Sequence, residues 1–104
     1  MNAKIKLGKK TYNVTINKQK YRDGNTAIEL VDQQDGESFC TLSTNLPDSC
    51  FLPDGTFYLK HWSENEGFAE QLLAQKVIEL VNEPEQSSGF VSGIKAYKLV
   101  EDNA

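Results

Sequence analysis

Short stretches in which apolar and polar residues alternate recur along the first sixty residues, and glycine-containing turns separate them. The stretches 4–7 and 11–17 alternate with period two on either side of such a turn, and the second places Tyr12, Val14 and Ile16 on one face. This period is that of a β-strand with one buried face. The pattern therefore predicts an N-terminal β-hairpin and restricts the chain to folds in which antiparallel sheet dominates.

Later segments continue the strand pattern. Asp35-Gly36 is a hairpin-turn signal, because glycine readily adopts positive φ. The further predicted strands are 26–32, 37–43, 56–60 and 89–100, the last with a kink at Gly93. The short apolar run 77–81 fits either a strand or a helix end, and 82–88 is predicted to be a polar loop.

One segment has helical spacing. Ser63 followed by Glu66 forms a capping box, in which each side chain can bond to the backbone N–H of the other residue. Phe68 and Leu72 then supply an apolar stripe. Gly67 is unfavourable inside a first helical turn, and a close backbone or aromatic contact is the expected reason for it.

These patterns predict the α+β class, with a mostly antiparallel sheet of about six to seven strands packed on one helix at about residues 64–76. The chain has 104 residues, which is the size of one domain, so 1–104 is expected to be a single domain.

Charge is distributed unevenly along the chain. Seven of the eleven basic residues and none of the fifteen acidic residues fall within residues 1–22. Such asymmetry is typical of a nucleic-acid contact, and the contact residues would be Lys4, Lys6, Lys9 and Lys10. The alternative is that neighbouring acidic strands offset the hairpin's charge. Tyr12 is expected to face the core, which leaves no evident platform for base stacking.

Residue types for catalysis and metal binding are sparse. One histidine and two cysteines without ligand spacing are poor material for a zinc site. No glycine-rich phosphate loop follows a predicted strand. His61 with Ser63, or with Cys50, has the residue types of a hydrolase, but no nucleophile motif surrounds either pair. We therefore expect a protein that is not an enzyme and uses no cofactor or metal.

Nothing in the sequence resembles a membrane span or a secretory leader. A cytoplasmic location with reduced cysteines is the corresponding expectation. Partner binding is predicted around the start of the helix, where aromatic and polar residues gather: Tyr58, His61, Trp62, Glu64 and Asn65. The alternative for Trp62 is that it closes the core where strand meets helix.

Four segments carry a resemblance to a family of small uncharacterised bacterial and phage domains from mobile elements. They are 44–47 (with Asn-Leu-Pro), 57–60, 62–67 (with Ser-Glu-Asn-Glu-Gly) and 88–91 (with Ser-Gly-Phe). The resemblance implies a cytoplasmic protein encoded on mobile DNA and assigns no catalytic residue. Together with small size and acidity, it suggests a non-enzymatic protein-binding module, such as an inhibitor of a host defence system of the anti-CRISPR or anti-restriction kind. The alternatives are a nucleic-acid accessory protein using the basic hairpin and a small hydrolase centred on His61.

Overall fold

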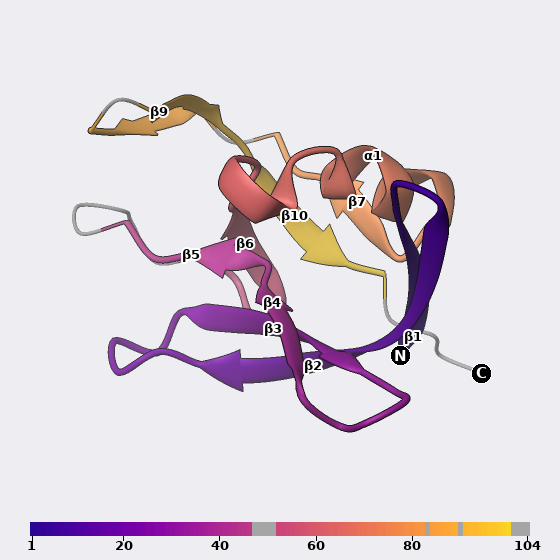
Figure 1. The fold of residues 1–104 in the computed structure, drawn as a ribbon. Coiled ribbons are helices and arrows are strands. Elements are labelled where there is room, and N and C mark those ends of the chain that lie inside the picture. Colours follow the sequence, from indigo (N-terminus) through magenta and orange to yellow (C-terminus); the bar gives the residue numbers. More distant parts are fainter. Residues whose placement is uncertain (47–51, 83, 90, 101–104) are drawn as a thin grey trace.

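The N-terminal half forms a four-stranded antiparallel meander (Figure 1). The computed structural model describes residues 1–46, 52–82, 84–89 and 91–100, apart from the side chains of Glu64 and Ser88. The strands of this first sheet, in spatial order, are β1 (Asn2–Leu7), β2 (Lys10–Lys20), β3 (Thr26–Asp32) and β4 (Ser38–Thr41). Val14 and Ile16 are buried and Tyr12 packs against the core, which confirms the predicted inner face of the hairpin.

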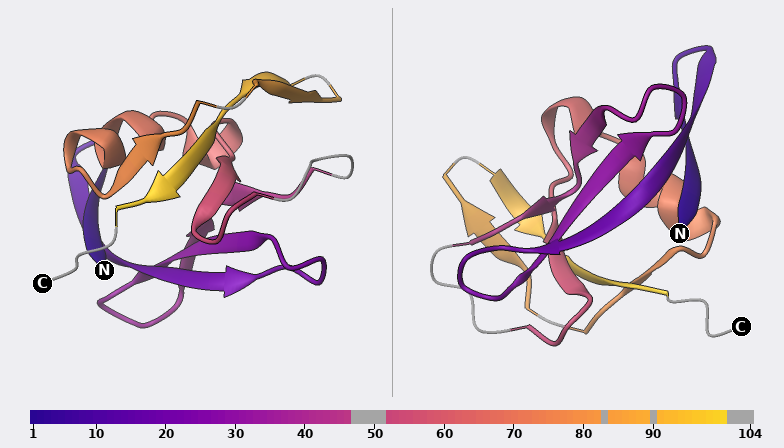
Figure 2. Two further views of the ribbon diagram at one scale, coloured as in Figure 1. Left: turned by 180° about the vertical axis from the view of Figure 1, so that it is seen from behind. Right: turned by 90° about the horizontal axis from the view of Figure 1, so that it is seen from below.

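A second antiparallel sheet lies across the core from the first, and a separate two-stranded ribbon projects from it (Figures 1 and 2). The second sheet has the order β5 (Ser43–Thr44), β6 (Thr56–Leu59), β10 (Ala96–Leu99) and β7 (Ile78–Leu80). The ribbon consists of β8 (Gln86–Ser88) and β9 (Val91–Ile94). The class is therefore α+β with mostly antiparallel strands, but the prediction of one sheet with six to seven strands is wrong.

Two predicted strands are each divided between sheets. The stretch 37–43 becomes β4 and β5, and Leu42 between them bonds to both sheets: its N–H donates to the Ile28 carbonyl at 2.9 Å, and its carbonyl accepts from Lys60 N–H at 2.7 Å. The stretch 89–100 becomes β9 and β10, with Gly93 at φ +69° near the division. The run 77–81 contains a strand, β7, and the predicted loop 82–88 contains β8.

The hydrophobic core lies between the two sheets and beneath the helix. Its buried side chains come from both sheets and include Ile5, Leu30, Phe57 and Leu59, while Phe68 and Leu72 extend inward from the helix. Cys40 is also buried there, as its strand pattern predicts, whereas Cys50 lies outside the described residues. No helix in the described part of the chain is long and apolar enough to cross a membrane.

The predicted helix is shorter than expected and begins differently. A single 3-10 turn, η1 (Ser63–Asn65), precedes the helix α1 (Phe68–Ala74). Neither element has a side-chain cap hydrogen bond, so the predicted capping box is wrong. Ser63 adopts φ +61°, which directs this segment away from capping geometry, and its carbonyl instead accepts the N–H of Glu66 at 3.2 Å.

Gly67 separates η1 from α1. It occupies the left-handed region at φ +84°, which residues with a Cβ reach only at a cost. A Cβ at this position would meet no atom within 4 Å, so the expectation that a close contact demands glycine here is wrong. The backbone reversal that starts α1 at Phe68 is the reason for this glycine.

The helix is joined to the edge of the first sheet by two glutamine side chains. Gln75 accepts the backbone N–H of Lys4 at 2.8 Å and donates to the Lys4 carbonyl at 2.7 Å. Gln71 makes the same pair with Lys6, at 2.7 and 3.0 Å. Four helical residues rise about 6 Å and two strand residues about 6.7 Å, so glutamines four apart match strand residues two apart. We call this contact the glutamine seam; it occupies the β1 edge as another strand would.

Candidate functional site

Two of the five predicted partner-binding residues are buried. Tyr58 is 5% exposed and packs with Leu46, Ile94 and Ala96 in a small apolar cluster. Asn65 is 0% exposed, and its side-chain amide donates to the Thr41 carbonyl at 2.8 Å, fastening η1 to β4. Neither side chain is therefore available at the surface, because both serve to join elements of the fold.

His61 and Trp62 remain at the surface. Both are half-buried, with their rings in an edge-on arrangement 5.3 Å apart. Trp62 packs partly against the Tyr58 cluster, so it closes the core on one side and is accessible on the other. His61 Nε2 lies 3.1 Å from the Ser92 carbonyl. This contact links β9 to His61 and does not assemble the catalytic pair with Ser63. The Glu64 side chain lies outside the described residues.

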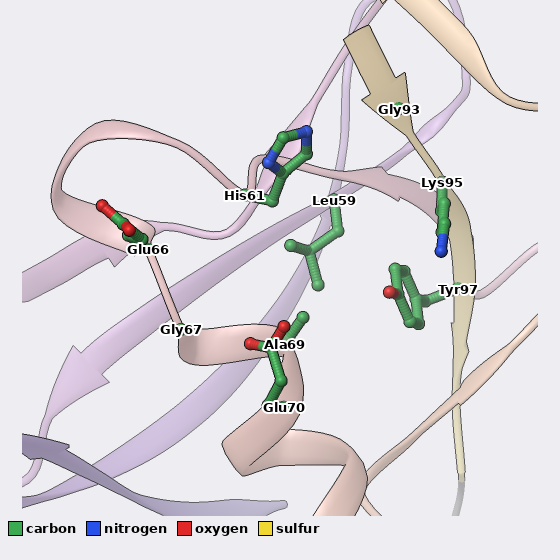
Figure 3. A pocket seen from close by; sticks show the side chains of 9 residues that line it. All are labelled: Leu59, His61, Glu66, Gly67, Ala69, Glu70, Gly93, Lys95 and Tyr97. Carbon is green, nitrogen blue, oxygen red and sulfur yellow. The ribbon is translucent and has the colours of Figure 1, made fainter. Parts of the chain in front are cut away.

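A pocket of about 320 Å³ opens beside His61, between β6, the start of α1 and the β9–β10 segment (Figure 3). Leu59, Ala69, Gly67 and Gly93 form its apolar and backbone surfaces. Its polar lining consists of His61, Glu66, Glu70, Lys95 and Tyr97. The pocket thus brings together two stretches of the chain, 59–70 and 93–97, that are far apart in the sequence.

Several polar groups of this pocket have no partner. Within the described part of the chain, the carboxylates of Glu66 and Glu70 make no hydrogen bond or ion pair, and the Tyr97 hydroxyl makes no hydrogen bond. Lys95 differs, because its ammonium lies 3.7 Å from the Glu85 carboxylate. The pocket therefore holds an excess of unused hydrogen-bond acceptors.

The surroundings of Tyr97 in the pocket shift the pKa of its hydroxyl. Burial raises the pKa of its hydroxyl above the ordinary value, and the nearby Glu70 carboxylate raises that pKa further. Both causes disfavour the phenolate, since a negative charge is costly in a desolvated place and beside another anion. Tyr97 is therefore a neutral hydroxyl over the physiological pH range.

The basic hairpin residues are exposed but do not share one face. Lys4 and Lys6 point outward from β1, Lys9 lies in the turn, and the Lys10 ammonium lies 4.7 Å from the centre of the Tyr12 ring. Tyr12 also contacts Phe39, with ring centroids 5.0 Å apart, so it offers no free face for a base. At the other end of β2, Asp54 pairs with Lys18 at 2.7 Å and with Lys20 at 3.2 Å. Nucleic-acid binding stays a prediction.

Of the residues that line the pocket, only His61 is also a predicted partner-binding residue. In 89–100, the apolar residues Ile94 and Ala96 indicate the strand. Gly93, Lys95 and Tyr97 alternate with them and lie on the pocket side. The period-two pattern of these three residues was the available signal. Nothing in the sequence indicated that Glu70 would lie opposite them, because that depends on where α1 packs.

Metal binding and the Asn-Leu-Pro segment can both be assessed from side-chain positions. Among the described residues, no group of three or more histidine, cysteine, aspartate or glutamate side chains could hold a metal ion. The Asn45 amide of the Asn-Leu-Pro segment donates to Asp23 at 2.9 Å, and this bond, followed by the backbone N–H of Asn25, lowers the pKa of the Asp23 carboxyl. Asn45, Asn65 and Gly67 thus have structural explanations.

Comparison with protein-family models, with curated proteins and with solved structures finds no match to this chain. The resemblance to mobile-element domains stays a prediction. The case for function therefore depends on the pocket and on the pair formed by His61, which lines it, and Trp62.

Proposed function

We propose that this protein is a non-enzymatic, cytoplasmic protein-binding module whose contact surface surrounds the pocket beside His61. The observation that carries the proposal is the set of unpartnered acceptors in that pocket, on Glu66, Glu70 and Tyr97. Polar groups without internal partners at the edge of a concave surface are available to a binding partner. The half-buried Trp62 contacts His61, with ring centroids 5.3 Å apart, and adds an aromatic surface next to the pocket-lining His61.

The proposal extends to the kind of partner. A small acidic chain with a net charge of −4 suits a basic surface on another protein. The sequence resemblance to mobile-element domains favours a host defence complex as that surface, with inhibition by occlusion. Hydrolysis is less favoured, because His61 bonds to a backbone carbonyl and not to a nucleophile.

The test is capture of a partner by the tagged intact protein, compared between variants. His61→Ala and Glu66→Ala alter the pocket rim at side chains that are not fully buried, while Glu37→Ala alters an exposed loop far along the chain as a control. A specific partner should be retained by the native protein and by Glu37→Ala, and its recovery should fall about tenfold or more with the rim variants. Equal recovery by all three variants, or no partner at all, would overturn the proposal. Restoration of phage or plasmid establishment in a defended host would then identify the inhibited system.

A further inference from the structure

The shape of the pocket limits what it can receive. Leu59, only 1% exposed, forms the floor, and the glycines Gly67 and Gly93 contribute no side chains to the walls. A Cβ at either glycine would meet nothing within 4 Å, so the space beside them is open. A volume of about 320 Å³ is at the small end of ligand pockets, which suits one side chain better than a nucleotide or a large cofactor.

A tyrosine hydroxyl on a mostly buried side chain faces this space. Tyr97 is 8% exposed, and its hydroxyl has no hydrogen-bond partner within the described residues. Figure 3 shows that the Tyr97 hydroxyl and the Glu70 carboxylate are both directed toward the space beside Leu59. A hydroxyl that is held on a mostly buried ring and directed into a pocket is positioned in advance to bond to a group that enters the pocket.

The chemistry of the lining calls for a cationic donor. Glu66 and Glu70 contribute two carboxylates, while the one lysine, Lys95, already faces Glu85. The Ser92 carbonyl can only accept, so His61 Nε2 donates to it and that N–H is already used. Acceptors therefore outnumber unused donors, and the net charge of the lining is negative.

We infer that the pocket receives an arginine side chain of the partner protein, with its guanidinium bound between Glu70 and the Tyr97 hydroxyl. This inference rests on the proposed function and names the chemistry of the contact. Arginine suits the site better than lysine because its planar group bonds to a carboxylate in a bidentate manner, stacks on aromatic rings and loses less hydration. The aromatic rings of His61 and Tyr97 line the same pocket.

The test titrates isotope-labelled intact protein with a blocked arginine, N-acetyl-arginine N-methylamide. Saturable changes in the amide shifts of Gly67 and Gly93 are expected, with weaker binding of the corresponding blocked lysine and no binding of blocked glutamate. Glu70→Gln should raise the dissociation constant about five- to tenfold, as loss of a charge-assisted contact predicts. Glu37→Gln is the matched control and should leave that constant unchanged.

The outcomes separate the inference from the proposed function. Stronger binding of blocked glutamate, absence of shifts with arginine, or equal arginine affinity in Glu70→Gln would overturn the arginine pocket. If a partner is captured equally well by native protein and Glu70→Gln, the binding function stands and the pocket inference fails. If blocked arginine binds through Glu70 but no partner is captured, the proposed function fails.

Discussion

The glutamine seam and the pocket both include polar side chains of α1, and they differ in whether those side chains have hydrogen-bond partners. At the seam, Gln71 and Gln75 satisfy the backbone of the β1 edge with four hydrogen bonds. At the pocket, Glu70 immediately before Gln71 has no hydrogen-bond partner within the described residues. Successive helical residues point about 100° apart, so neighbours in sequence can serve different surfaces. The helix α1 therefore uses one face to complete the fold and leaves the other available for binding.

The largest effect is expected where the pocket wall is fastened to the first sheet. Asn65→Asp would bury a carboxylate facing the Thr41 carbonyl and should lower the free energy of unfolding by about 3–5 kcal/mol at neutral pH. Burial raises the pKa of the introduced carboxyl, so the loss should be small below its unfolded pKa of about 3.9 and grow as pH rises. Urea unfolding across pH measures this. Asn13→Asp on exposed β2 is the control, and equal losses in both variants would contradict a buried anchor at Asn65.

The seam itself should give the next largest effect. The double variant Gln71→Ala/Gln75→Ala removes all four bonds to β1 and should cost about 1–3 kcal/mol, because water replaces part of each bond. It also opens a strand edge, so self-association is expected to increase. Urea unfolding and sedimentation measure the two changes. Gln19→Ala, an exposed glutamine on β2, should alter neither; a stable, monomeric double variant would show that the seam is dispensable.

The junction between η1 and α1 should respond to backbone preference alone. Gly67→Ala should cost about 1–2 kcal/mol, because alanine is disfavoured at φ +84° even where a Cβ has room. Ser63→Gly should act in the opposite direction, since Ser63 already adopts φ +61°. Thermal unfolding of the pair provides the measurement. Equal stability of native protein and Gly67→Ala would indicate that the junction relaxes to a different conformation.

The smallest effect on stability is expected at the pocket. Glu70→Gln should change the free energy of unfolding by less than about 0.5 kcal/mol, because its side chain is exposed and has no partner among the residues that the structure describes. The pKa of the Tyr97 hydroxyl should fall, since one of its two causes of elevation is removed. In the native protein, the contribution of the neutral Tyr97 hydroxyl to the free energy of unfolding is fully present below the unfolded tyrosine pKa of about 10. This contribution is lost as pH rises through the higher pKa of the folded state. Absorbance titration of tyrosinate, with Tyr97→Phe to assign the signal, measures the change; an unaltered pKa would contradict electrostatic contact with Glu70.

Local patterns determined much of this protein. Alternation and turn residues predicted the hairpin of β1 and β2, the strand β3 and the inner face with Val14 and Ile16. The apolar stripe at Phe68 and Leu72 predicted the buried side of α1. These features depend on contacts close in sequence, or on burial that each segment displays in its own pattern.

Tertiary structure alone decided the sheets, the seam and the pocket. A period-two pattern cannot show that the chain changes sheets at Leu42, because either sheet would bury the same residues. Ser63 and Glu66 have the types of a capping box, yet the positions of Asn65 under β4 and of Gly67 in the left-handed region set the backbone there. Glu70 of α1 and Tyr97 of β10 line the same pocket, a long-range arrangement that no local spacing encodes.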